Sequence, residues 1–157
     1  MKAIHWIIAA AVLAFVEPAQ AGVNDPEVLI YRGSGVLDTG GGSFTGNATA
    51  FHCTNFSGVN ENIRFVIRNA NTTIVANQII VAGHLGTVTV LTKDPVLFPI
   101  GIRLILDTGV VQQGTVAIAA TSINVTCTAM MIQASTANAV GIKLHMTRFN
   151  PIPATQE

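Results

Sequence analysis

The chain has 157 residues, and its 8 lysine and arginine residues balance its 8 aspartate and glutamate residues. This length suits a single domain with a sizeable core. The neutral balance provides no basic patch to neutralise phosphates, so nucleic acid is not an expected partner. Charged residues are few, while Thr, Asn, Val, Ile, Ala and Gly are frequent, which is typical of β-rich domains outside the cytosol.

The first 21 residues have the pattern of a secretory signal peptide. Lys2 precedes an apolar run from Trp6 to Val16, and Glu17-Pro18 ends that run ahead of Ala19-Gln20-Ala21, a small-x-small cleavage site. The run is too short to span a membrane, and no later segment is both long enough and free of charge. The sequence therefore predicts a secreted or periplasmic protein with no membrane span after cleavage and one domain over residues 22–157.

Short apolar–polar alternations, separated by Gly, Asn, Asp and Pro, follow one another along this domain. The predicted strands are 28–32, 49–54, 63–69, 73–82, 87–92, 100–107, 115–119, 122–132 and 140–149. The glycine-rich segment 33–46 is predicted to be a loop. Eight or nine strands at this spacing, with no sustained helical period, predict an all-β, antiparallel, immunoglobulin-like β-sandwich in which each sheet has one wet face.

The stretch 49–69 has the clearest pattern. Side chains 63, 65 and 67 are apolar, whereas positions 64 and 68 between and after them are arginines, so this strand is expected to bury one face only. In the preceding strand the same parity places Cys53 on the inward face with Phe51 and places His52 on the opposite face.

Cys53 and Cys127 are the only two cysteines. In an oxidising compartment two thiols in one chain are expected to form a disulfide, and both residues belong to the apolar faces of their strands. We expect this bond to join the two sheets and to contribute roughly 4 to 5 kcal/mol through loop closure. A metal or redox site with His52 is the alternative; it is disfavoured because His52 lies on the opposite face and the chain has no Cys-x-x-Cys motif.

Asp-Thr-Gly occurs twice, beginning at Asp38 and at Asp107, each time after apolar residues. The motif resembles the active-site signature of aspartic proteases, in which two facing carboxylates share one proton. The two copies are too close in the sequence to belong to two protease lobes. Asp and Gly at strand ends also form ordinary turns, and the sequence favours this turn interpretation, with Asp38 and Asp107 as the candidate catalytic residues of the alternative.

Other catalytic patterns are weaker. Ser34 and Ser43 lie in the glycine-rich segment, but the chain has no Gly-x-Ser-x-Gly elbow, and His52, His84 and His145 lie on separate elements. The glycine-rich segment also lacks the Gly-Lys-Ser/Thr ending of a phosphate-binding loop. No cofactor or metal-binding residue is predicted.

Several short motifs occur in an order similar to that of small exported bacterial β-sandwich proteins, a family with no assigned function. They are Cys53-Thr54-Asn55, Ile63 to Asn69, Gly86-Thr87-Val88-Thr89, Gln113-Gly114-Thr115, Cys127-Thr128-Ala129 and Leu144 to Pro151. The resemblance covers most of residues 22–157. It implies export, a disulfide and a bacterial source, and it implies no site residues.

Three functions are compatible with these patterns. The first is a non-catalytic structural or binding domain at the cell envelope or exterior, which recognises a protein or glycan through a sheet face, a sheet edge or a loop such as 33–46. The second is an aspartic protease-like hydrolase that uses Asp38 and Asp107. The third is a module that binds a small ligand or a metal.

Overall fold

The computed structural model describes residues 24–98, 103–138 and 140–149, which form ten strands and no helix. The strands are β1 (Val28–Asp38), β2 (Asn47–Asn55), β3 (Glu61–Arg68), β4 (Ile74–Ala82), β5 (Thr87–Leu91), β6 (Arg103–Ile105), β7 (Val111–Ala120), β8 (Val125–Gln133), β9 (Ile142–Leu144) and β10 (Met146–Arg148). Within these ranges no helix could cross a membrane. The predicted signal peptide, 1–21, lies outside the described residues.

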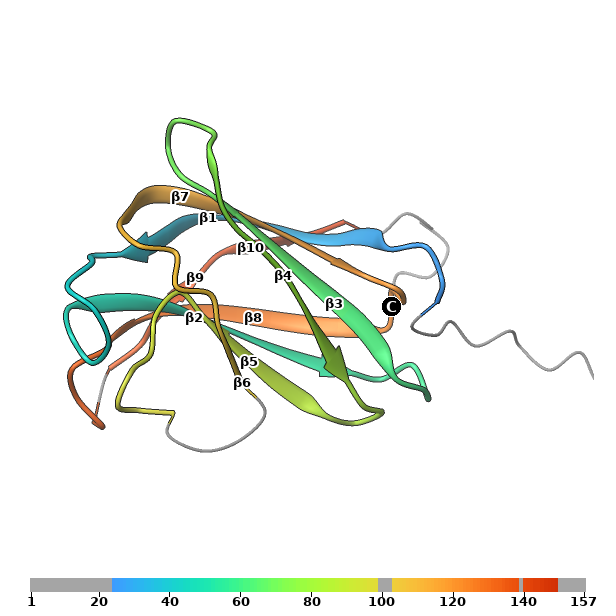
Figure 1. Ribbon diagram of the computed structural model, residues 1–157. Helices are drawn as coiled ribbons and strands as arrows, with labels where there is room; N and C mark the ends of the chain where they lie inside the picture. The colour runs from blue at the N-terminus through green and yellow to red at the C-terminus, as the bar shows by residue number, and fades with distance from the viewer. Residues whose placement is uncertain (1–23, 99–102, 139, 150–157) are drawn as a thin grey trace, which may run out of the picture.

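The strands stack as two five-stranded sheets (Figure 1). Sheet A has the order β10-β1-β7-β3-β4, and sheet B has the order β6-β5-β2-β8-β9. The predicted all-β sandwich is confirmed. One pair departs from the antiparallel prediction, since β6 runs parallel to β5.

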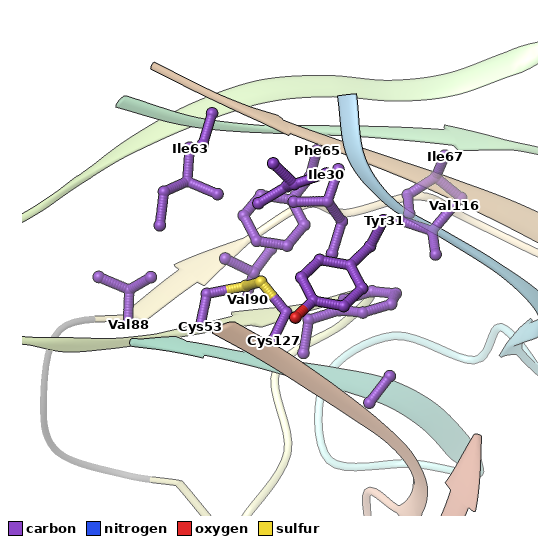
Figure 2. Packing of buried hydrophobic residues seen from close by; sticks show 14 of the residues in the cluster. Ile30, Tyr31, Cys53, Ile63, Phe65, Ile67, Val88, Val90, Val116 and Cys127 are labelled. Carbon is purple, nitrogen blue, oxygen red and sulfur yellow. A yellow bond between two sulfur atoms is a disulfide. The ribbon is translucent and has the colours of Figure 1, made fainter. Parts of the chain in front are cut away.

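The core fills the space between the sheets and follows the predicted alternation. Ile63, Phe65 and Ile67 of β3 are fully buried. Phe65 meets Phe51 of β2 across the two layers, with ring centroids 5.8 Å apart. Figure 2 shows Ile30 and Tyr31 of β1 packing into the same region from sheet A.

Cys53 and Cys127 form the predicted disulfide, but within one sheet. They are direct partners on β2 and β8 of sheet B, with Cα atoms 4.1 Å apart, and the bond points into the core (Figure 2). The expectation of an inter-sheet bond was wrong. Stacked sheets are about 10 Å apart, whereas two opposed inward-facing residues on neighbouring strands already lie within disulfide reach.

The glycine-rich segment 33–46 is only partly a loop, because β1 continues to Asp38. Gly33 pairs with Val116 inside the sheet, and a Cβ at Gly33 would lie only 3.1 Å from Met146 Sδ. Gly35 has a φ of 82° at a register shift of β1 against β7. These glycines therefore mark a close approach and a β-bulge rather than a break in the strand.

The predicted strand 140–149 is divided in two. β9 pairs with β8 in sheet B, whereas β10 pairs with β1 in sheet A, and His145 lies between them. The apolar alternation continues through the division, since Leu144 and Met146 both pack against the core. Sequence alternation predicts the face of a sheet on which a side chain lies, but it does not predict a change of sheet. The sequence around His145 therefore does not predict that this residue lies beside sheet A.

The outer faces of the two sheets differ. On sheet B, Ala50 and Leu91 are fully buried in a second cluster with Phe98 and Ile105, which belong to the segment after β5 and to β6. The predicted wet face of sheet B is therefore partly covered. The outer face of sheet A carries partly and fully exposed side chains such as Arg32, and the candidate site lies there.

Candidate functional site

A hollow of about 310 Å³ opens on the outer face of sheet A. Its lining combines cationic, hydroxyl and small apolar side chains from β1, β3, β7, β10 and the residue before β10. The lining residues are Arg32, Gly33, Ser34, Val66, Arg68, Thr115, Val116, Ala117, His145 and Thr147.

Strand register explains how side chains form the hollow at this point. Two cross-strand rows form the floor and walls, Thr147–Arg32–Ala117–Val66 and Ser34–Thr115–Arg68. The central strand β7 contributes short side chains, while its neighbours β1 and β3 contribute one arginine each. Short side chains between long ones leave a trough along β7, and arginines stand on both sides of it.

The hollow has uncompensated positive charge. Arg32 and Arg68 line it, and none of the described residues around it is acidic. A third arginine of the same face, Arg64, is already paired, because Glu27 binds it through two hydrogen bonds of 2.6 and 3.1 Å. The hydrogen bond that Arg64 donates to Glu27 raises the pKa of Arg64. Only two of the three guanidinium groups are therefore available to a ligand.

Neighbouring groups hold these two arginines in place. The guanidinium carbon of Arg32 lies 5.8 Å from the centre of the Phe149 ring, in cation–π geometry. Arg68 donates a 2.9 Å hydrogen bond from Nη1 to the carbonyl oxygen of Thr72, in the turn that joins β3 to β4. Each contact uses only part of a guanidinium group, which has five N–H donors. The remaining donors can serve a ligand without the cost of ordering a free side chain.

Ser34, Thr115 and Thr147 add hydroxyl groups, and His145 adds an imidazole ring, all exposed at the hollow. Hydroxyl groups both donate and accept hydrogen bonds. The arrangement can therefore bind a negatively charged group between the arginines while it hydrogen-bonds neutral polar groups beside them.

The first Asp-Thr-Gly motif forms a structural turn at the end of β1. Asp38 is 2% exposed, and its Oδ1 accepts hydrogen bonds from Gly40 N at 2.8 Å and from Lys93 Nζ at 2.7 Å. Lys93 also donates to the carbonyl oxygens of Gly40 and Thr45, so all three of its ammonium hydrogens have acceptors. This ion pair fastens the loop between β1 and β2.

The second Asp-Thr-Gly motif contacts the first one through the side chain of Thr108. Thr108 Oγ1 donates to Asp38 Oδ2 at 3.3 Å, whereas Asp107 is exposed and has a φ of 47°. An aspartic protease requires two carboxylates that face each other. Here the buried carboxylate faces a lysine, and the other points to solvent.

The remaining predicted candidates are dispersed. His52 Nδ1 lies 3.0 Å from Thr89 Oγ1 and its ring meets that of Phe98 on sheet B, where burial lowers the pKa of His52. His84 Nδ1 accepts a hydrogen bond from Gly58 N. Of the serines, Ser34 lines the hollow, and Ser43 lies in the loop after β1. Over residues 24–98, 103–138 and 140–149, no three His, Cys, Asp or Glu side chains gather in a metal-binding arrangement.

Two features were missed by the sequence analysis. Arg68 was placed on the outward face of its strand, but only the pairing of β3 with β7 and of β7 with β1 places it diagonally across β7 from Arg32. Glu61 is fully buried, with one oxygen bonded to Thr121 and the other without a partner. Its parity with Ile63 was the available signal, since both belong to the inward face of β3.

Comparison of the chain with protein-family models, with curated proteins and with solved structures finds no match. The assignment of function therefore depends on the chemistry of the hollow, and the resemblance to small exported bacterial β-sandwich proteins stays a prediction.

Proposed function

We propose that this protein is an exported, non-catalytic binding domain that recognises an acidic saccharide in the hollow of sheet A. The main support is that Arg32 and Arg68 line the hollow from the two sides of β7, with hydroxyl groups between and beside them. Arginine forks match carboxylate and sulfate oxygens, with which they form two parallel hydrogen bonds.

A saccharide fits this lining better than other anions. The acidic group binds the two arginines. The sugar hydroxyls form hydrogen bonds with the hydroxyl groups of Ser34, Thr115 and Thr147. Stacking of nucleic acid bases favours Phe, Tyr and Trp side chains, and the described lining has none of these three. A bare phosphate would leave most of the 310 Å³ unfilled.

The sheet is a suitable platform for such a site. Its hydrogen-bonded strands fix the spacing of the two arginines, so a ligand does not have to order a loop when it binds. A disulfide in the underlying sheet further restricts the unfolded chain, and such bonds persist in oxidising compartments. This agrees with export to the periplasm or the exterior, where acidic polysaccharides are encountered.

A saccharide panel tests the proposal. Oligomers of a uronic acid, sulfated oligosaccharides and neutral glucose oligomers of the same length are titrated against the protein at low and high salt. We expect binding of at least one acidic series, no binding of the neutral series, and weakening with salt because the arginines are exposed. Equal binding of acidic and neutral oligomers, or no binding of either acidic series, would refute the proposal.

A further inference from the structure

β4 is an unusually long open edge. The four sheet edges formed by the described residues are β10, β6 and β9, with three residues each, and β4, with nine. Within the described ranges β4 pairs with β3 alone. Every second residue of β4 therefore directs its N–H and C=O groups away from the sheet.

The sequence of β4 has little protection against pairing with another strand. Edge strands are commonly guarded by charged residues, proline or bulges. Residues 74–82 read IVANQIIVA, with no charge and no proline. One register shift lies near Ile74, at the start of the strand, and the rest of the strand pairs regularly with β3. Ile79 and Val81 are 41% and 50% exposed, so apolar surface accompanies the open backbone.

We propose that β4 pairs in antiparallel fashion with β4 of a second copy of this chain, about a two-fold axis at Ile79. Residues 76–82, the part of β4 that pairs regularly with β3, can pair with the same residues of a second copy that runs in the opposite direction. This register aligns Ala76 with Ala82, Asn77 with Val81, Gln78 with Ile80, and Ile79 with itself. Residues of equal parity face each other, so both cores stay on one side of the joined sheet and both outer faces on the other.

Charge and shape favour a second copy as the partner. No like charges meet along the strand, because β4 has none, and Glu27 neutralises Arg64, the residue of β3 that lies opposite Ile79. Pairing covers the exposed side chains of Ile79 and Val81 and satisfies the open edge of both chains at once. A partner strand with alternating charged side chains could form the same backbone hydrogen bonds with β4. It would, however, place charged side chains against Ile79 and Val81.

The proposed dimer has a consequence that rests on the proposed function. Its two-fold axis is perpendicular to the joined sheet, so both arginine-lined hollows open on the same side. A polymer with a repeating acidic group could then occupy both hollows, and this would raise its apparent affinity above that of a single short oligomer.

Sedimentation without any saccharide tests the pairing separately from the hollow. We expect the wild-type protein to shift from monomer to dimer as its concentration rises through the micromolar range. Ile79→Lys places two ammonium groups together at the axis and should yield a monomer at every concentration. Ile142→Lys is the matched control, because Ile142 is 61% exposed on β9 of the other sheet, and it should dimerise as the wild type does.

A covalent test fixes the register. Directly opposed residues on antiparallel strands lie within disulfide reach, so Ile79→Cys should yield a covalent dimer on mild oxidation, whereas Ile142→Cys should not. A wild-type protein that stays monomeric, an Ile79→Lys variant that still dimerises, or equal crosslinking at both positions would overturn the proposal. Short-oligomer binding by monomeric Ile79→Lys would show an intact hollow, so failure of the dimer and failure of the site can be told apart.

Discussion

Lys93 Nζ lies 2.7 Å from Asp38 Oδ1, and the two side chains are 5% and 2% exposed. The residue that the sequence offered as a protease candidate is thus one half of a buried ion pair. Removing only one partner of such a pair leaves an uncompensated charge in the interior.

Lys93→Met should therefore lower the free energy of unfolding by roughly 3 to 5 kcal/mol. The double variant Asp38→Leu/Lys93→Met should recover much of this loss, because no buried charge remains. Denaturation in urea measures both values. If Lys93→Met lowers the free energy of unfolding by no more than the double variant does, the ion pair has no stabilising role in the loop between β1 and β2.

The disulfide gives a second prediction. Replacing both Cys53 and Cys127 with alanine opens a loop whose ends are 74 residues apart in the sequence. Loop-closure entropy predicts a loss of roughly 4 to 5 kcal/mol, with an unchanged spectroscopic signature of the strands if the variant still folds. A loss below about 1 kcal/mol would show that pairing of β2 with β8 constrains these residues without the bond.

Much of the fold, but less of the site, could be predicted from the sequence. Alternation in β3 identified the buried Ile63, Phe65 and Ile67 because a strand has only two faces. Strand order and register depend on contacts between distant segments, so neither the same-sheet position of the disulfide nor the presence of Arg32 and Arg68 in one hollow could be read from local patterns. The inter-sheet bond had motivated the immunoglobulin-like comparison, which stays a prediction.

His52 predicts how stability depends on pH. Burial lowers the pKa of His52 below its usual value of 6.5 in the folded protein, so the unfolded chain takes up a proton first as pH falls. His52 should therefore contribute full stability above pH 6.5. This contribution should decrease between 6.5 and the lower folded-state pKa and stay constant below that value.

Titration of the His52 ring by NMR measures this effect directly. Phe98→Ala uncovers the imidazole, since the two rings are 5.2 Å apart, and it should move the pKa of His52 back toward 6.5. His52→Gln should remove the corresponding part of the pH dependence of unfolding. A pKa of His52 at or above 6.5 in the wild-type protein would contradict the proposed role of burial.

The most direct test of the central claim is calorimetric titration of arginine variants with the acidic oligosaccharide that binds the wild-type protein. Arg32→Gln and Arg68→Gln should each weaken binding roughly tenfold to a hundredfold, as expected for the loss of a charge-assisted hydrogen bond. The double variant Glu27→Gln/Arg64→Gln removes an ion pair from the same face without changing the net charge, so it should bind as the wild type does. Equal weakening by all three variants, or unchanged binding by Arg32→Gln and Arg68→Gln, would contradict recognition in the hollow.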